Sequence, residues 1–158
     1  YMTTSVRTGP GPDDFAAPTY FYVEPAGEAN FTGPVILLQN RMSVSAAENF
    51  ALAMRTLPHV TQVGDFTSGC FADMAGVDLP NGWRSSYSYN LFLDGDGRCW
   101  EGIGVPPDIM VPGEELQDDV DSVFELALAL LQGDGPALQD ETASAEEARK
   151  LTGVKCIR

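Results

Sequence analysis

Lysine is scarce in this sequence: Lys150 and Lys155 are the only two, and both lie in the last nine of its 158 residues. Acidic residues dominate, because 23 Asp and Glu stand against 9 Lys and Arg and leave a net charge of -14. A surface of this charge repels phosphate backbones and anionic membranes. We therefore expect no nucleic-acid partner and no binding to a lipid surface.

Histidine and cysteine are also rare, and long apolar runs are missing. Cys70, Cys99 and Cys156 lie far apart and lack the paired C-x-x-C spacing of zinc sites, so we expect unpaired thiols, no bound metal and no cofactor. The apolar runs fall short of the ~20 residues that a membrane-spanning helix needs. With 44% hydrophobic residues, however, a chain of this length can bury a sizeable core.

Hydrophobic periodicity predicts strands and helices that alternate in the middle of the chain. Residues 1–18 are rich in Gly, Pro and Asp and are expected to form an irregular lead-in. Predicted strands cover residues 19–24, 35–38, 60–63 and 83–93, the last folding back through a turn at 94–97 onto 98–101 as a hairpin. Predicted helices cover residues 45–57, 119–132 and 144–151, and the second carries the apolar stripe Val120, Val123, Phe124, Ala127, Leu128 and Leu131.

The most informative residue is Ser45, which stands between the strand at 35–38 and the helix that follows. Backbone amides at a helix N-terminus are unpaired and the dipole there is positive, so an oxyanion forming beside Ser45 would be stabilised. A nucleophile on such a turn is exposed and held rigidly. The same residues also match a capping box, in which Ser45 and Glu48 satisfy each other's backbone amides. Such caps are common and stabilise a helix by only ~0.5–2 kcal/mol, so this motif alone favours the cap.

Six blocks of sequence, taken together and in order, shift the balance toward catalysis. They are residues 31–38 (FTGPVILL), 43–48 (SVSAAE), 63–69 (VGDFTSG), 79–82 (LPNG), 96–98 (DGR) and 101–109 (EGIGVPPDI). This pattern resembles the C-terminal processing peptidases, or tail-specific proteases, a family of serine peptidases related to the tricorn core protease and to a retinoid-binding protein of the photoreceptor matrix. The resemblance covers about residues 19–111.

The resemblance implies roles for three residues of this sequence. Ser45 corresponds to the nucleophile, and the amide of Ala46 corresponds to one oxyanion donor. Glu101 corresponds to the glutamate that orients the polar partners of the general base in the tricorn-like branch.

The general base itself has no counterpart in this sequence. In the processing-peptidase branch a lysine follows the T-[SA]-G block, but Cys70 stands at that position, and a thiol suits neither the reach nor the role of that lysine. The tricorn-like branch uses a histidine from the first half of the catalytic core. His59 follows the nucleophile helix instead, where a partly exposed loop histidine is the simpler explanation. The paired-glycine block that completes the oxyanion hole in the family is also missing.

These observations lead to one main expectation about fold and function. The resemblance implies an α/β fold of the Clp protease and crotonase kind, with helices flanking a layered sheet, present here as an incomplete catalytic core. We expect residues 1–18 to be the lead-in, 19–132 the nucleophile-bearing C-terminal half, and 133–158 an acidic tail with a short helix.

The expected function is a serine endopeptidase that cleaves polypeptide or peptide substrates through an acyl-enzyme. Its base would come from the upstream half of its own chain, so the 158 residues alone would be nearly inactive. The alternative is a non-catalytic ligand- or peptide-binding module, as in the retinoid-binding relative. Relatives are often exported in bacteria, but no residue here indicates a compartment or an oligomeric state.

Overall fold

The computed structural model describes residues 1–28, 30–111 and 121–133. Its elements, in chain order, are β1 (Met2–Val6), β2 (Thr19–Phe21), β3 (Val35–Gln39), α1 (Ala46–Arg55), β4 (Val60–Gly64), β5 (Met74–Asp78), β6 (Arg84–Ser88), β7 (Asn90–Asp94), β8 (Ile109–Met110) and α2 (Ser122–Gln132). The expected α/β class is confirmed. The predicted helix at 144–151 and the first two residues of the one at 119–132 lie outside the described residues.

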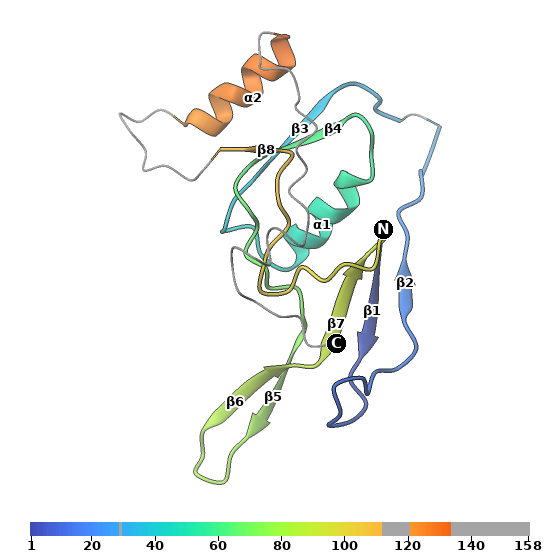
Figure 1. The fold of residues 1–158 in the computed structure, drawn as a ribbon, viewed down its shortest axis with the longest axis vertical. Coiled ribbons are helices and arrows are strands. Elements are labelled where there is room, and N and C mark those ends of the chain that lie inside the picture. Colours follow the sequence, from blue (N-terminus) through green and yellow to red (C-terminus); the bar gives the residue numbers. More distant parts are fainter. Residues whose placement is uncertain (29, 112–120, 134–158) are drawn as a thin grey trace.

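A parallel sheet in the order β3-β4-β8 carries the candidate nucleophile turn. Parallel strands need a crossover, and α1 supplies it between β3 and β4. In Figure 1, α1 and α2 lie on opposite sides of this sheet. The predicted strand–turn–helix–strand unit is therefore confirmed, with α1 ending at Arg55, two residues before the predicted Leu57.

The face of α2 that is buried differs from the predicted one. Phe124, Leu128 and Leu131 are exposed, whereas Val123, Leu126, Ala127 and Leu130 are wholly or partly buried at three- and four-residue steps. In a helix with apolar side chains almost all around, the sequence pattern does not select a unique inner face. The contacts with β3 and β4 select it.

A second, antiparallel sheet has the order β2-β1-β7, and its central strand lies in the segment predicted to be irregular. Strand β1 pairs with β7 from Met2 opposite Asp94 to Val6 opposite Asn90. The prediction of an irregular lead-in over 1–18 is therefore wrong for Met2–Val6, and residue 19 is not a domain boundary. This strand is stabilised by a partner some 90 residues later in the sequence, which local composition does not reveal.

The predicted long strand at 83–93 is two strands that belong to different sheets. It breaks at Tyr89, whose N–H donates to Asp73 O, and β6 pairs with β5 whereas β7 pairs with β1. Residues 98–101 are not a strand, so the predicted hairpin is wrong, although the turn at 94–97 is present. The hairpin that does form, β5–β6, extends away from the rest of the described chain (Figure 1).

The core joins α1 to the antiparallel sheet and to the 99–105 segment. Its buried members are Met2, Leu52, Phe66, Phe71, Phe92, Trp100, Ile103 and Val105. The Trp100 indole N–H donates to Asp94 Oδ2 at 2.8 Å, so its polar atom is satisfied. Cys99 is buried and disulfide-bonded, so the expectation of unpaired thiols is wrong there, whereas Cys70 is free and exposed.

The turn at 104–108 is anchored to the C-terminal end of α1. Arg55 donates to Pro106 O at 2.6 Å and to the side chain of Gln62 at 3.1 Å, and it pairs with Asp108 at 3.6 Å. Gln62 is fully buried and donates to Ala51 O at 2.6 Å. These bonds hold the 104–108 segment against both α1 and β4.

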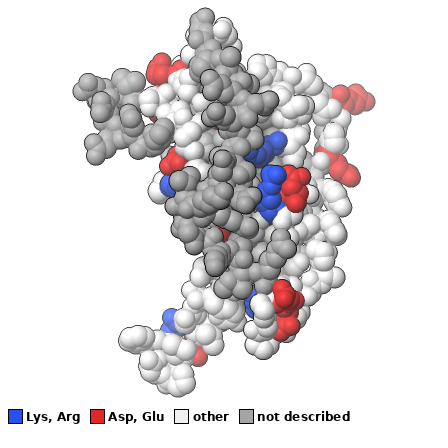
Figure 2. Space-filling model, in the orientation of Figure 1, with Lys and Arg blue, Asp and Glu red and all other residues white. Residues whose placement is uncertain are grey.

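The described residues can be examined for surface charge, for membrane-spanning helices and for metal-binding clusters. On the face shown in Figure 2 the visible basic side chains are few, and those near its centre lie beside acidic atoms. Within the described ranges, no helix is long and apolar enough to cross a membrane, and no cluster of His, Cys, Asp and Glu could hold a metal ion.

Substitution of Gly69 tests how closely two loops pack. Gly69 has φ 81, and a Cβ placed there would lie 2.7 Å from the backbone nitrogen of Ile103. We expect Gly69→Ala to lower the free energy of unfolding by about 1–3 kcal/mol more than a control that has only the conformational cost. Chemical denaturation of both variants measures the difference.

Gly82→Ala is the matched control, because Gly82 has φ 82 and no neighbour within 4 Å of the added Cβ. Its free energy of unfolding should fall by only about 1–2 kcal/mol, which is the cost of holding alanine in the left-handed backbone conformation. Equal losses in the two variants would show that the loops have room to separate.

Candidate active site

The backbone of Ser45 is strained. Its φ is 55 and its ψ is -112, and among the described residues no other non-glycine residue has a positive φ. Such conformations cost on the order of 1–3 kcal/mol and persist only where the surroundings impose them. An ordinary N-cap residue has extended backbone instead, so Ser45 occupies the cap position without the cap conformation.

The side chain of Ser45 caps α1 only loosely. Ser45 and Glu48 form a capping box, in which the Ser45 N–H donates to Glu48 Oε2 at 3.0 Å. The Ser45 hydroxyl faces the N–H of Glu48, but this contact falls short of a regular cap hydrogen bond, and the residue is exposed. The predicted box is thus present, with its serine half weaker than its glutamate half.

An unused amide lies directly beside this hydroxyl. The N–H of Ala46, the first residue of α1, has no acceptor among the described residues, and Ala46 is exposed. Amides at the N-terminus of a helix stabilise negative charge. Ser45 and Ala46 together place a hydroxyl next to a free hydrogen-bond donor.

The carboxylate of Glu48 lies at the centre of the site and is fully buried. Its Oε2 accepts from the N–H of Ser45 and, at 2.8 Å, from the N–H of Cys70. Its Oε1 accepts from Thr67 Oγ1 and from the N–H of Gly69, both at 2.6 Å. Glu48 thus ties the Ser45 turn to the loop that follows β4.

Glu101 binds the next two amides of the same loop. Its Oε2 accepts from the N–H of Phe71 at 2.8 Å and from that of Ala72 at 2.9 Å. Two carboxylates, Glu48 and Glu101, therefore take the four successive amides of residues 69–72. The structure brings Glu101 to the loop beside Ser45 through contacts with the loop backbone.

Further bonds fasten this loop to the segment before Ser45. The Ser68 N–H donates to Ser43 O at 2.9 Å. Arg41 donates to Thr67 O at 3.1 Å and to Ile103 O at 2.9 Å, and its guanidinium lies over the Phe66 ring at 5.0 Å. Arg41 thereby joins the Ser45 turn, the loop after β4 and the 99–105 segment.

The position of Cys70 agrees with the sequence comparison that placed it at the lysine site of the processing branch. Its amide shares one oxygen of Glu48 with the amide of Ser45, so the two backbone segments are adjacent. A side chain at position 70 therefore begins close to Ser45. In this sequence that side chain is an exposed, free thiol.

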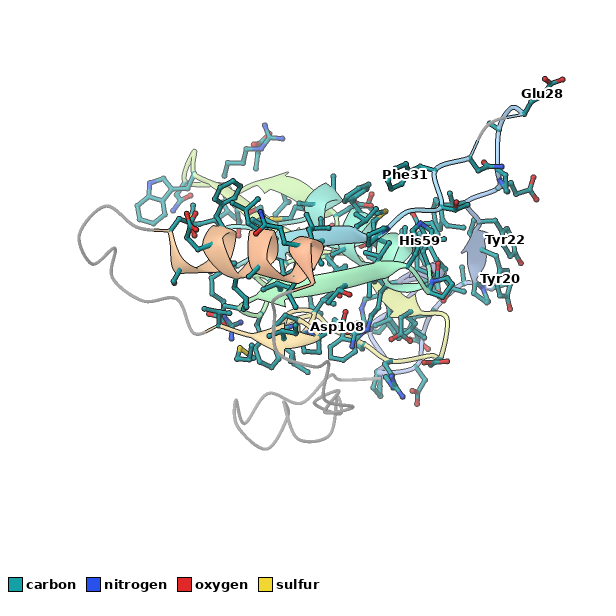
Figure 3. All side chains as sticks on the ribbon, turned by 90° about the horizontal axis from the view of Figure 1, so that it is seen from above. Tyr20, Tyr22, Glu28, Phe31, His59 and Asp108 are labelled. Atoms are coloured by element: carbon teal, nitrogen blue, oxygen red, sulfur yellow. The ribbon has the colours of Figure 1, made fainter. Side chains whose placement is uncertain are left out.

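His59 lies at the opposite edge of the parallel sheet. Its carbonyl accepts from the N–H of Val35, at the beginning of β3, whereas Ser45 follows the end of that strand. The ten residues of α1 separate the two by about 15 Å. In the view of Figure 3, His59 lies at the same end of the molecule as Tyr20 and Tyr22.

Sequence reasoning identified Glu48 only as the cap partner of Ser45, and it missed Thr67. The i, i+3 spacing of Ser45 and Glu48 is visible in the sequence, but the contacts of Glu48 with residues 67–70 span 19 to 22 positions. A threonine in the T-S-G block was the available signal for Thr67.

Comparison with known proteins decides the family. The model of peptidase family S41 matches residues 3–111. A protein of Parabacteroides merdae that is assigned as a peptidase has been solved as a crystal structure. It shares 35% sequence identity with this chain, and the match covers 90% of this chain with a TM-score of 0.74. The chain belongs to peptidase family S41. The resemblance to the C-terminal processing peptidases is thereby confirmed, and the S41 match begins at residue 3 rather than 19 because β1 is part of the fold.

More distant S41-like folds share the architecture. Mature CPAF, solved in complex with lactacystin, is 22% identical over 77% of this chain, with a TM-score of 0.62. The chain spans 44% of the Parabacteroides merdae protein and 26% of CPAF. It therefore corresponds to part of these S41 proteins.

Substitution of Arg41 tests whether this side chain holds the Ser45 turn, the loop after β4 and the 99–105 segment together. Arg41→Lys keeps the charge but loses the planar donor group that reaches two carbonyls and stacks on Phe66. We expect it to lower the free energy of unfolding by about 1 kcal/mol. Arg98→Lys, in an exposed ion pair with Asp96, should change it by less than about 0.5 kcal/mol. Similar effects of both in urea denaturation would contradict a structural role for Arg41.

Proposed function

We propose that this protein is a serine endopeptidase of the C-terminal processing, or tail-specific, type, which hydrolyses polypeptide or peptide substrates through an acyl-enzyme. Membership of the S41 family supports this at the level of the family. The observation that carries the proposal for this chain is the Ser45 turn. Ser45 is exposed at positive φ, and its hydroxyl caps α1 only loosely.

Ser45 would attack the scissile carbonyl carbon with its Oγ. The carbonyl oxygen would become negative, and the N–H of Ala46 would stabilise it at the N-terminus of α1. The general base would take the Oγ proton and pass it to the amine of the leaving peptide as this intermediate collapses, which leaves an ester on Ser45. Water would then hydrolyse the ester, releasing the acid and restoring the Ser45 hydroxyl. The position at the carboxyl ends of β3 and β4 supports this, because α/β proteins commonly bind ligands at that edge.

Glu101 would act at a distance from the reacting atoms. We propose that it orients the polar partners of the general base, as in the tricorn-like branch. Its hold on the amides of Phe71 and Ala72 supports a role in shaping the loop next to Ser45.

The general base would come from outside these 158 residues. His59 lies at the other end of the parallel strands from Ser45, and Cys70 stands where the processing branch has its lysine. We further propose that residues up to 132 form the nucleophile-bearing C-terminal half of a catalytic core. A base contributes about 10²–10⁴-fold to the rate, so the 158-residue chain alone should hydrolyse peptides little or not at all.

A fluorophosphonate probe, which reacts with activated serines, tests the nucleophile in the full-length protein. We expect Ser45→Ala to abolish labelling, because the reacting oxygen is removed. Ser43→Ala, two residues away, should be labelled like the wild type. Equal labelling of the wild type and Ser45→Ala would refute the assignment.

The same variant separates the nucleophile from a plain helix cap. Because the Ser45 hydroxyl makes only a loose contact with the N–H of Glu48, Ser45→Ala should change the free energy of unfolding by less than about 0.5 kcal/mol, below the usual effect of losing a cap. A larger loss with unchanged peptide hydrolysis would favour the cap. A wild-type protein that binds an unfolded polypeptide but is not labelled would favour the non-catalytic binding module.

A further inference from the structure

We propose that Glu48 is a positioning residue of the peptidase site, which holds the backbone of Ser45 at positive φ and so fixes the position of its hydroxyl. The inference rests on the proposed role of Ser45 as nucleophile. The sequence pattern by itself gives Glu48 only the role of cap partner to Ser45.

The torsion angles of Ser45 are determined by the two peptide groups that flank it. On the amino side, the Ser45 N–H is directed at Glu48 Oε2. On the carboxyl side, the Ser45 carbonyl accepts from the N–H of Glu48 at 2.9 Å and from that of Asn49 at 3.0 Å, as the first turn of α1 requires. With both peptide groups held, φ and ψ have little freedom.

Glu48 can impose this geometry because it is itself held from the other side. Its carboxylate accepts from Thr67, Gly69 and Cys70 on the loop after β4, in addition to Ser45. Four donors match the four acceptor positions of a carboxylate. The position in the first turn of α1 also favours a negative charge. Glu48 is thus fixed by the loop, and it transmits that position to Ser45.

Loss of the acceptor should release the strain. Without it, Ser45 would relax to the extended backbone of an ordinary N-cap, and its hydroxyl would move with the backbone. A nucleophile displaced by about 1 Å reacts about 10²-fold more slowly, while substrate contacts elsewhere are unchanged. The effect is therefore expected on kcat and not on KM.

Glu48→Met tests this in the full-length protein, because methionine is of similar size and offers no comparable acceptor. We expect kcat for a peptide substrate to fall about 10²-fold, with KM within about threefold of the wild type. Gln62→Met is the matched control. Gln62 is equally buried and packs against the other end of α1, so this variant should lose thermal stability yet keep kcat within about threefold. Both are assayed well below their melting temperatures.

Glu48→Gln is a second variant that retains an acceptor. Its amide oxygen can still accept from Ser45 and Cys70, while the Thr67 hydroxyl turns to accept from the new NH₂ group and the Gly69 N–H loses its acceptor. We expect partial retention of function, with kcat about fivefold below the wild type because neutral hydrogen bonds are weaker than charged ones. If Glu48→Met does not fold, this variant decides, and an unchanged kcat would overturn the proposal.

A crystal structure of Glu48→Met gives a measurement that does not depend on activity. We expect the φ of Ser45 to become negative. Retention of φ near 55, or a wild-type kcat, would overturn the positioning role. If the wild type shows no Ser45-dependent activity, the proposed function fails, whereas the φ of Ser45 in the variant still tests whether Glu48 controls this turn.

Discussion

The buried carboxylate of Glu48 is the interaction on which the rest of the site depends. It accepts from the backbone of Ser45 on one side and from Thr67, Gly69 and Cys70 on the other. A buried negative charge is costly unless it is fully hydrogen-bonded, so these segments can separate only at a large cost. Two turns that follow neighbouring parallel strands are thereby fixed to each other, at the sheet edge where Ser45 is exposed.

Other charged side chains hold the rest of this loop through its backbone groups. Glu101 takes the two amides that follow those bound by Glu48, and Gly69 allows the backbone of the 102–104 segment to come close. Arg41 closes the arrangement from the other side through two carbonyls. Backbone groups rather than side-chain pairs are the main partners in each case. The conformation of the loop therefore depends on a few charged side chains at defined positions.

Local pattern predicted the parts of the fold that local interactions determine. The β3–α1–β4 unit was predicted because apolar runs and helical periodicity lie within one short stretch. Strand β1 was missed because its partner β7 is distant in sequence. The break at Tyr89 was missed for a similar reason, since one continuous β-prone run serves two sheets. The inner face of α2 was misplaced because nearly every position of that helix is apolar.

The sequence by itself determined the S41 membership, the strand–turn–helix position of Ser45 and the presence of a glutamate three residues later. These depend on residue types and short spacings. The tertiary structure decided that Ser45 adopts positive φ at the N-cap of α1, and that Glu48 and Glu101 share the amides of one loop. The physical reason is that a backbone torsion is set by the bonds on both flanking peptide groups. One of those bonds runs to a carboxylate that is held by residues some 20 positions away.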